Sequence, residues 1–438
     1  MKKIVVAGAG HGGLTASYHL ALSGYDVTVI EHSKKEDMGY DWHDALDFSA
    51  FDDSGIPRPS EDMYSFNLPT GFTNPSSTVM LDIPYVKGKG IYMDRKVLVN
   101  YLISLCENAG VKFIFGAEVM AALTEGERAV GVRYSIDGED RFIFCDLLID
   151  AAGMHSSVRK SLPSSCNIRK ELQPREIFYV HRVYFENITG ELTEPQYIIK
   201  LFHMNRPGID WVLTEKGFVD ILIGKFGAAG ELTQGEIDEA IAALRKQYPF
   251  MGEKVLRGGK TAEIPLTRML PMIICDGYAA VGDSAGMTVP LNGSGIILSM
   301  AAGKILADTV ISAGDKELSK AVLWKYEYEY FNKYGKDLIM IDILKNFFTY
   351  INGEHVDYFL EKEILTSKEL DFDSGEGIEI TPEYVKKIIS ALGPVIGLVP
   401  TIVKNLKALP FIDAVAKQMP KTYNQEKIDK WIKKYEAL

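Results

Sequence analysis

The 438-residue sequence predicts an α/β fold in which a parallel-sheet domain carries an inserted, mostly antiparallel β-sheet and is followed by a helical C-terminal region. Three observations predict this architecture. Two strand–turn–helix units, one at the N-terminus and one after residue 277, both contain glycine-rich turns. Between them, residues 175–227 alternate with period two, which is typical of strands that bury one face. After about residue 320 the chain is rich in Tyr, Phe and Lys and is predicted to be helical.

The N-terminal unit has the pattern of a dinucleotide-binding βαβ segment. Residues 4–7 are an apolar run, as a buried parallel strand requires, and residues 27–30 form a second strand that leads to Glu31. Between these strands lie a turn with the spacing G-x-G-x-x-G and a helix that stops at Gly24. The glycines of the turn are Gly8, Gly10, Gly12 and Gly13.

Each part of this unit has a physical role in holding a dinucleotide. Gly8 permits the tight turn, Gly10 lets the backbone approach a pyrophosphate, and Gly13 lets the helix pack on the strand. The helix N-terminus offers unpaired N–H groups to the phosphates. Glu31 can accept hydrogen bonds from ribose hydroxyls. The alternative is a glycine-rich turn in an ordinary βαβ unit, but the strand, helix and terminal acid together favour dinucleotide binding.

Composition argues against several classes of function. A net charge of −11 argues against nucleic acid as a partner and against a surface that generally seeks anionic lipids. Cys106, Cys145, Cys166 and Cys275 are scattered without a C-x-x-C pair. This predicts structural cysteines in a reducing cytoplasm and no metal, iron–sulfur or dithiol redox centre. Because the first strand begins within three residues of the N-terminus, no signal peptide is expected.

Membrane contact is expected only at a surface. No segment offers the ~18–20 uninterrupted apolar residues that a spanning helix needs. Residues 388–403 come nearest, but Gly393, Pro394, Gly397 and Pro400 interrupt them. This stretch could cap a lipid-binding tunnel, dip into a bilayer interface or pack in a helical layer. The predicted location is therefore cytoplasmic, with peripheral membrane contact through the C-terminal region as the alternative.

A second glycine turn with an acid follows a buried strand at residues 278–281. Gly282 and Asp283 begin this turn, and Pro290, Gly293 and Gly295 precede the next helix. An NAD dehydrogenase would not need a second such turn, about 270 residues downstream of the first, to complete its site. The second turn therefore favours FAD over NAD as the bound cofactor.

Two intermediate segments fit the same domain. A helix that begins near Arg95 leads to a strand at residues 111–115. A strand at residues 146–149 leads into the run A-A-G-M-H-S-S-V-R, which contains Gly153. Beyond the alternating segment, Thr233-x-x-Glu236 is a capping box and predicts a helix to about residue 248.

This order of motifs resembles the flavoprotein hydroxylase superfamily (p-hydroxybenzoate hydroxylase-like), in which one FAD site is assembled from three separated pieces of chain. The resemblance covers residues 1 to about 310. It implies that Arg95 binds the pyrophosphate or adenosine side and that Asp283 bonds the ribitol or pyrophosphate region. It also implies that the backbone N–H groups of Gly293 and Gly295 lie beside the pyrimidine edge of the isoalloxazine, where a helix N-terminus stabilises negative charge on reduced flavin.

The resemblance implies a division into three regions. Residues 1–45, 90–165 and 262–320 would form the discontinuous, Rossmann-like FAD-binding domain. Residues 46–89 and 166–261 would form the substrate-binding β-sheet domain, and residues 321–438 the helical C-terminal region.

Within this superfamily the sequence is similar to the geranylgeranyl reductase-like group. That group carries G-D-A-A-G followed by N-P-L-x-G-G-G-I, and here residues 282–286 read G-D-S-A-G and residues 289–296 read V-P-L-N-G-S-G-I. Of the group's substrate-sheet segment P-G-Y-G-W-x-F-P, only Pro207, Gly208 and Trp211 are present. The resemblance therefore supports the fold and the flavin chemistry of the group more strongly than it supports an isoprenoid substrate.

Three residues are candidates for a catalytic role. His181 lies in the alternating sheet and could donate a proton, although a single strand histidine is more often structural. Trp211 could line a pocket against the flavin or belong to the core. His43 lies where the superfamily's chain passes near the flavin.

The resemblance implies an FAD-dependent oxidoreductase that reduces carbon–carbon double bonds of an apolar, isoprenoid or lipid-like small molecule by hydride transfer from reduced flavin. The electron donor would be NAD(P)H or a reduced electron-transfer protein. The alternatives are a flavin-dependent monooxygenase or hydroxylase and an electron-transfer flavoprotein of the quinone-linked type without an iron–sulfur cluster. A flavin- or NAD-binding module without enzymatic activity is the fourth reading.

Overall fold

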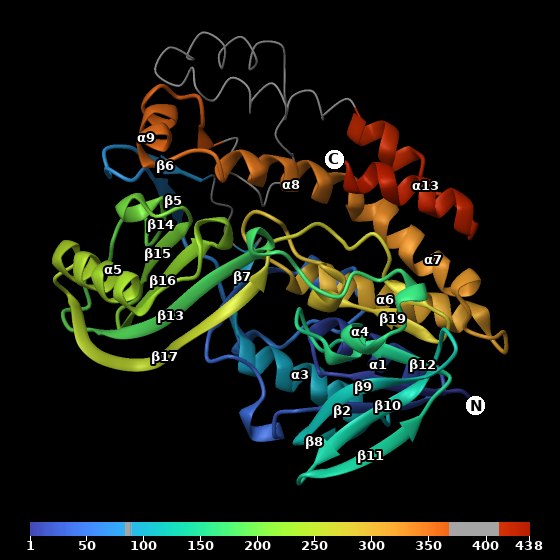
Figure 1. Ribbon diagram of the computed structural model, residues 1–438. Coiled ribbons are helices and arrows are strands. Elements are labelled where there is room, and N and C mark those ends of the chain that lie inside the picture. Colours follow the sequence, from blue (N-terminus) through green and yellow to red (C-terminus); the bar gives the residue numbers. More distant parts are fainter. Residues whose placement is uncertain (84–87, 89, 368–410) are drawn as a thin grey trace.

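The computed structural model describes residues 1–83, 88, 90–367 and 411–438. Figure 1 shows a parallel-sheet domain at the lower right, an antiparallel sheet at the left and a layer of helices above both. The α/β fold with an inserted antiparallel sheet and a helical C-terminal region is therefore confirmed. The predicted loop at residues 371–377 and the apolar stretch at residues 388–403 lie outside the described residues.

The parallel-sheet domain is built on six strands in the order β18-β19-β12-β1-β2-β8. All neighbouring pairs are parallel except β18 and β19. Its strands are β1 (Lys3–Ala7), β2 (Asp26–Glu31), β8 (Lys112–Phe115), β12 (Leu147–Asp150), β18 (Ile274–Cys275) and β19 (Tyr278–Ala280). Its long helices are α1 (His11–Leu22), α3 (Arg95–Asn108) and α6 (Ile296–Ala313). Helices α1 and α6 meet so closely that a Cβ on Gly303 would lie 2.3 Å from the Gly12 carbonyl oxygen, so the contact requires glycine.

Two small sheets flank this domain. The first, in the order β11-β10-β9, is an antiparallel meander that the sequence analysis did not predict. The second, in the order β3-β7-β4, carries the chain toward the antiparallel sheet. Their strands are β9 (Ala117–Glu125), β10 (Arg128–Ile136), β11 (Glu139–Phe144), β3 (His43–Asp47), β4 (Tyr64–Phe66) and β7 (Gly90–Asp94).

The inserted sheet has seven strands in the order β17-β13-β16-β15-β14-β5-β6, and only β14 and β5 pair in parallel. Its strands are β5 (Thr70–Thr73), β6 (Met80–Asp82), β13 (Ile177–Asn187), β14 (Tyr197–Leu201), β15 (Ile209–Thr214), β16 (Phe218–Phe226) and β17 (Met251–Pro265). The capping box of Thr233 and Glu236 begins α5 (Gln234–Gln247), as predicted, and α5 covers one face of the sheet. Because side chains alternate along a strand, the sheet has two distinct faces.

The C-terminal helices lie over the other face of the seven-stranded sheet and beside the parallel-sheet domain (Figure 1). They are α7 (Lys320–Tyr330), the π-helical η8 (Phe331–Gly335), α8 (Lys336–Phe348), α9 (Gly353–Glu361) and α13 (Gln425–Glu436). The remaining short helices are η1 (Lys35–Asp37), α2 (Ser49–Asp52), η2 (Glu61–Met63), α4 (Ser157–Ser161), η3 (Ser164–Cys166), η4 (Pro174–Glu176), η5 (His203–Asn205), η6 (Gly227–Ala229) and η7 (Gly282–Ala285).

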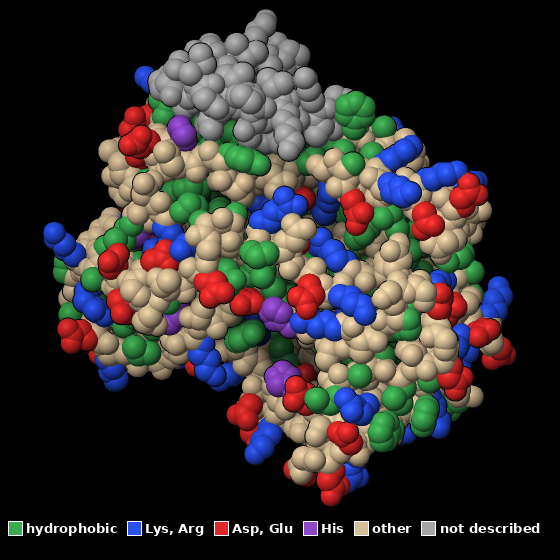
Figure 2. Space-filling view, viewed as in Figure 1, with side chains coloured by type: hydrophobic (Ala, Val, Ile, Leu, Met, Phe, Trp, Pro, Cys, Tyr) green, Lys and Arg blue, Asp and Glu red, His purple; other side chains and the backbone are tan. Residues whose placement is uncertain are grey.

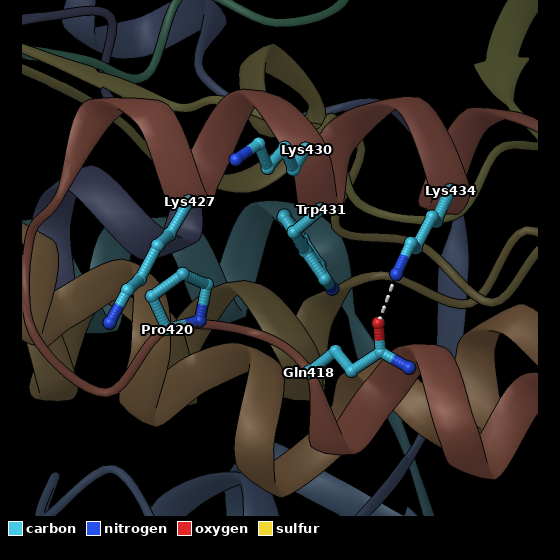
Figure 3. A pocket seen from close by; sticks show the side chains of 6 residues that line it. All are labelled: Gln418, Pro420, Lys427, Lys430, Trp431 and Lys434. Carbon is cyan, nitrogen blue, oxygen red and sulfur yellow. Dashed lines mark hydrogen bonds between the residues drawn. The ribbon is translucent and has the colours of Figure 1, made fainter.

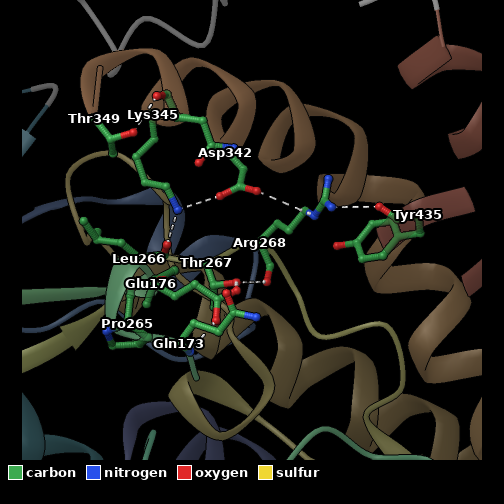
Figure 4. Close-up of polar contacts among 12 residues, drawn as sticks. Gln173, Glu176, Pro265, Leu266, Thr267, Arg268, Asp342, Lys345, Thr349 and Tyr435 are labelled. Atoms are coloured by element: carbon green, nitrogen blue, oxygen red, sulfur yellow. Dashed lines mark hydrogen bonds and ion pairs between the residues drawn. The ribbon is translucent and has the colours of Figure 1, made fainter. Parts of the chain in front are cut away.

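A chain of polar contacts attaches α8 and α13 to the segment between β17 and η7 (Figure 4). The buried Lys345 Nζ donates to the Leu266 carbonyl oxygen at 2.5 Å and to Asp342 Oδ1 at 2.7 Å. Arg268 Nε lies 3.6 Å from Asp342 Oδ2, and Arg268 Nη2 donates to the Tyr435 carbonyl oxygen at 2.7 Å. The C-terminal helices are therefore fixed to the chain that leads into the second glycine turn.

The expectation of unconnected, reduced cysteines is wrong for two of the four. Cys166 and Cys275 form a disulfide although they are 109 residues apart. The sequence could not show this, because the pairing depends on edge strand β18 lying beside η3. Cys106 and Cys145 are free thiols, and burial raises the pKa of each to about 12, which keeps them protonated.

One helix among the described residues, α6, is long and apolar enough to cross a membrane by length and composition, which the sequence analysis did not anticipate. The mean hydropathy of its 18 residues is 1.6, but 56% of them are buried inside the protein. Its close contact with α1 is that of a core helix in a parallel-sheet domain.

Glu327 of α7 generates a prediction about pH and stability. Its side chain is fully buried, Oε2 accepts from the Ile273 N–H at 3.1 Å, and Oε1 has no partner in the described part of the chain. Burial raises its pKa from 4.5 to about 8, against a smaller lowering by the Ile273 N–H. Between these values the unfolded chain releases a proton that the folded chain keeps, so stability falls as pH rises from about 4.5 to 8.

We therefore expect Glu327→Gln to match the wild-type melting temperature near pH 4.5 and to exceed it at pH 9, where ionising the buried acid costs roughly 3–5 kcal/mol. Thermal unfolding followed by circular dichroism across this pH range measures the difference. Glu329→Gln, on the same helix but exposed, is the control and should leave the pH profile unchanged. Parallel pH profiles for wild type and Glu327→Gln would contradict the assignment.

Candidate active site

The N-terminal glycine turn has the close approaches that its sequence predicted. Gly8 has a φ of +89°, and a Cβ there would lie 2.5 Å from the Ala151 carbonyl oxygen. Gly10 is the N-cap of α1. A Cβ on Gly13 would lie 2.6 Å from the Ala151 Cβ, so glycine allows α1 to pack against the end of β12. The turn leaves the α1 N-terminus open to a phosphate group.

Glu31 lies at the end of β2 and faces this turn. Its Oε2 accepts from the Ala9 N–H at 2.8 Å, and its Oε1 accepts from the Ser33 N–H at 2.9 Å. His32 Nδ1 lies 2.8 Å from Oε1. Burial alone would raise the pKa of Glu31, but the bonds from His32, Ala9 and Ser33 hold it below its usual value. The carboxylate is therefore ionised and next to the turn, where a ribose would need an acceptor.

Asp150 connects the pieces of chain that form the site, and the sequence analysis missed it. This fully buried carboxylate at the end of β12 accepts four hydrogen bonds. The donors are the Ala152 N–H (3.1 Å), Ser156 Oγ (2.6 Å), Tyr278 OH (2.9 Å) and Ser284 Oγ (3.0 Å). The A-A-G-M-H-S-S-V-R run, which is the second block of the chain in this site, is thereby bonded to the second glycine turn. Gly153 lies within this run and has a φ of +83°.

The arginine of the A-A-G-M-H-S-S-V-R run completes this connection. Arg159 is fully buried, and its guanidinium donates to the carbonyl oxygens of Ser284 (Nη1, 2.5 Å) and Met154 (Nη2). A buried guanidinium is stable only when its donors are bonded. Arg159 therefore fixes the Ser284 backbone immediately after Asp283.

The second glycine turn presents Asp283 and the N-terminus of α6 to the same space. Gly282 has a φ of +70°, and Gly295 is the N-cap of α6. Gly293, with a φ of +74°, would place a Cβ 2.8 Å from Ile264 Cγ2 of β17, while Pro290 is buried in the turn. Burial raises the pKa of Asp283, and Arg95 opposes the rise. No described residue donates a hydrogen bond to the Asp283 carboxylate.

Arg95, the first residue of α3, is bonded to an acid instead of being free. Its Nε and Nη2 donate to the two Asp44 oxygens at 2.6 and 2.5 Å, and its guanidinium lies over the rings of Tyr40 and Trp42. His11, at the start of α1, faces this pair, and its buried Nε2 has no partner among the described residues. Burial, with Arg95 adding to it, lowers the pKa of His11 to about 4, so its ring is neutral.

These observations test whether FAD fits the site. A Cβ on Gly8 or Gly13 would lie 2.5 or 2.6 Å from Ala151, Glu31 accepts from the Ala9 N–H of the same turn, and Gly10 and Gly295 are the N-caps of α1 and α6. His11 Nε2 is buried without a partner among the described residues, and no described residue donates a hydrogen bond to the partly buried Asp283 carboxylate. A flavin dinucleotide supplies phosphates, hydroxyls and ring heteroatoms for these groups, so the residues fit FAD.

His43 and Trp211 lie near this space, on the side of the seven-stranded sheet. The His43 N–H donates to Tyr184 OH at 2.9 Å, and the ring packs edge-on against Tyr184 and Phe218. Burial, with Arg257 as the next cause, lowers the pKa of His43. Trp211 lies with its ring 5.0 Å from the Arg182 guanidinium, and its buried Nε1 has no partner within the residues that the structure describes.

A buried ion pair that the sequence did not reveal fixes this side of the site. Arg182 of β13 donates from Nε (3.0 Å) and Nη2 (2.5 Å) to the Asp220 carboxylate of β16. Its Nη1 donates to the His43 carbonyl oxygen. The pair therefore holds the segment around His43 against the sheet.

His181 is not brought to the site. Neighbouring residues of a strand point to opposite faces, and His181 bonds Thr261 Oγ1 through Nδ1 at 3.2 Å. Burial lowers its pKa, and Asp238 of α5 partly opposes this. His181 thus lies on the face covered by α5, opposite Arg182 and Trp211, and the structure does not support it as a proton donor.

The sheet face that carries Arg182 and Trp211 is otherwise apolar and is covered by α8 and α9. Its buried members form one cluster that reaches the second glycine turn at Leu291. They include Trp42, Phe72, Phe178, Val180, Leu201, Leu222, Phe226, Leu266, Phe348, Val356, Phe359 and Leu360. Figure 2 shows the surface hollowed near its centre, between the seven-stranded sheet and the parallel-sheet domain, with histidine side chains at the rim. Among the described residues, no three metal-ligating side chains gather.

The site combines a dinucleotide-binding glycine turn, an acid at the end of the second strand and a second glycine turn at a helix N-terminus. This combination is typical of a dinucleotide-dependent oxidoreductase. Residues 85–309 match the family of FAD dependent oxidoreductases, and residues 6–44 match the NAD(P)-binding Rossmann-like domain. The chain belongs to the FAD-dependent oxidoreductase family.

Its relatives share the reductase name that the motifs suggested. The chain is 22% identical to the digeranylgeranylglycerophospholipid reductase of Sulfolobus acidocaldarius over 427 residues, covering 93% of this chain and 90% of that one. It is 26% identical to the reductase of the same name from Haloferax volcanii over 349 residues, covering 74% and 80%. The resemblance to the geranylgeranyl reductase-like group is confirmed.

Solved structures show the same fold. A geranylgeranyl bacteriochlorophyll reductase-like protein from Thermoplasma acidophilum superposes with a TM-score of 0.74 at 18% identity, covering 93% of this chain and 99% of that one. The myxobacterial chondrochloren halogenase, an FAD-dependent enzyme, has a TM-score of 0.64 at 16% identity, covering 99% and 96%.

Asp283 provides a direct test of the assembled site. Asp283→Ala should weaken FAD binding by roughly 10- to 150-fold, the equivalent of one charge-assisted hydrogen bond of about 1.5–3 kcal/mol. Titration of the apoprotein with FAD, followed by flavin fluorescence, measures this. Asp308→Ala, in an exposed pair with Lys304 on the same helix α6, is the matched control. Equal affinities for the two variants would show that Asp283 does not contact the cofactor.

Because Arg182 and Asp220 form a buried ion pair, we expect their contributions to the free energy of unfolding to be strongly coupled. Asp220→Ala should cost about 3–5 kcal/mol of unfolding free energy, because it leaves a buried guanidinium uncompensated. The double variant Arg182→Met/Asp220→Leu should lose much less, since neither charge remains. Urea unfolding of both proteins measures the difference, and equal losses would mean that the pair is not effectively buried.

Proposed function

We propose that this protein uses FAD to reduce carbon–carbon double bonds in an isoprenoid chain of a lipid. The observation that carries the proposal is the apolar sheet face, which continues from β13, β15 and β16 to the flavin-side turn at Leu291. Supporting it, the relatives from Sulfolobus acidocaldarius and Haloferax volcanii are named as reductases of a digeranylgeranyl glycerophospholipid.

The apolar face explains how such a substrate would be held. Phe178, Val180 and Leu222 of this face are buried beneath α8 and α9, and Leu266 connects them to the loop of Gly293. A substrate chain would therefore have to enter between the sheet and these helices. Burial of a hydrocarbon against such side chains contributes roughly 25 cal/mol per Å². A single methylene group changes binding by only about 1–3 kcal/mol, so this face would accept several chain lengths.

The residues around the flavin position would control charge and water. Bound FAD, when reduced, supplies the hydride. The α6 N-terminus at Gly295 would stabilise negative charge on reduced flavin, and neutral His11 would offer Nε2 to the cofactor without adding charge. Tyr184 keeps its proton because burial raises its pKa, and Trp42 and the apolar face exclude water.

The electron donor would be NAD(P)H or a reduced electron-transfer protein. In the described part of the chain there is one six-stranded parallel sheet, and its glycine turn faces Glu31 and the proposed FAD position. A nicotinamide would therefore have to reach the same flavin from outside, or a protein partner would have to reduce it.

Anaerobic turnover tests this proposal against the monooxygenase alternative. The FAD-loaded protein, chemically reduced without oxygen, should be reoxidised by a polyprenyl lipid and should yield a product heavier by two hydrogen atoms. Flavin absorbance and product mass are measured together, with FAD-free protein as the control. Reoxidation only after oxygen is admitted, with one oxygen atom added to the product, would establish the monooxygenase. Oxidation by a quinone with no change in the lipid would establish the electron-transfer flavoprotein.

A further inference from the structure

A pocket lined by lysines lies on α13, away from the FAD site. It has a volume of about 340 Å³ and is lined by Gln418, Pro420, Lys427, Lys430, Trp431 and Lys434 (Figure 3). The three lysines lie on one side of the helix, at intervals of three and four residues, and all are exposed. We call these three residues the lysine face.

The base of the lysine face is rigid, whereas the charges are accessible. Trp431 is buried, its Nε1 donates to the Val415 carbonyl oxygen at 3.0 Å, and its ring stacks on Tyr435. Lys434 Nζ donates to Gln418 Oε1 at 2.5 Å (Figure 3), which leaves the ammonium charge uncompensated. Lys427 forms no ion pair within the described part of the chain.

The acids nearby cancel only part of this charge. Glu426 pairs with Lys430 at 2.6 Å and offsets its charge, whereas Lys427 and Lys434 have no carboxylate partner among the described residues. Asp429 accepts from Gln425 Nε2, and Glu436 is exposed near the end of α13. None of these acids lines the pocket. A surface with three lysines is thus present on a chain whose net charge is −11.

Exposed aromatic side chains occur in the same helical layer. Phe411, in the described helical residues 411–417 before Gln418, is 61% exposed, and Tyr350, just after α8, is 58% exposed. Exposed aromatic residues are typical of the boundary between lipid headgroups and hydrocarbon. This layer also covers the apolar sheet face through α8 and α9 (Figure 1).

We propose that the lysine face docks this protein on the phosphate surface of an anionic lipid bilayer. The inference rests on the proposed lipid substrate, since an enzyme that acts on a lipid chain must obtain it from a membrane. An acidic protein is repelled by an anionic bilayer in most orientations, so a local basic face also sets the orientation of approach. The same repulsion disfavours nucleic acid, which would need a larger basic surface.

Vesicle binding by the full-length, FAD-loaded protein tests the docking. Wild type should partition onto dimyristoyl phosphatidylglycerol vesicles in low salt but not onto phosphatidylcholine vesicles, and 0.5 M NaCl should release it, because the Debye length then falls to a few Å. Lys427→Gln/Lys430→Gln/Lys434→Gln should reduce partitioning at least ~10-fold. The triple Lys→Arg variant, which keeps the charge, should restore it.

The matched control is Lys112→Gln/Lys246→Gln/Lys254→Gln, which removes three exposed lysines elsewhere and should leave partitioning unchanged. Equal loss in both triple variants, binding to neutral vesicles, or no binding by wild type would each overturn the proposal. Release by inorganic phosphate but not by chloride at equal ionic strength would identify a small-anion site instead. Because saturated vesicles contain no alkene, this result is independent of reductase activity.

Discussion

The site depends on one buried carboxylate. Asp150 accepts hydrogen bonds from groups that lie up to 134 residues away in the sequence, on the second block of the chain and on the second glycine turn. A fully buried carboxyl group is stable only when hydrogen-bond donors surround it, so the burial of Asp150 requires that these segments come together. With Arg159 bonded to Ser284, it fixes the position of the turn that carries Asp283. The glycine turns leave room for a dinucleotide, and the hydrogen bonds of Asp150 and Arg159 determine where this room lies.

Side chains alternate between the two faces of the seven-stranded sheet, and the two faces have different roles. One face packs on α5 through a mainly apolar cluster, with His181 at its margin and with the buried polar residues Asp210 and Lys200 on the same face. The other face contacts α8 and α9 and carries the Arg182–Asp220 pair beside Trp211. A buried ion pair contributes little net stability but is strongly unfavourable when half of it is removed, so it restricts the arrangement. Here it holds the His43 segment against the face that we assign to the substrate.

The features that the sequence predicted correctly were local ones. The turn from Gly8 to Gly13, the capping box at Thr233 and the strand that ends at Glu31 each depend on residues within one element or its neighbour. What could not be predicted depends on long-range pairing. The pairing of Arg95 with Asp44, for example, links residues 51 positions apart. Asp150, the Arg182–Asp220 pair and the meander of β9 to β11 have no local sequence signal.

The disulfide between Cys166 and Cys275 has a consequence for the connectivity of the chain. These residues lie on either side of the strands from β13 to β17, so the bond closes a loop that contains most of the inserted sheet. In the chain-entropy description, a cross-link that closes ~100 residues removes roughly 4.7 kcal/mol of disorder from the unfolded state. A protease that cuts once within this loop would leave two fragments still covalently joined. Nicked protein would therefore migrate as one species until a reductant is added.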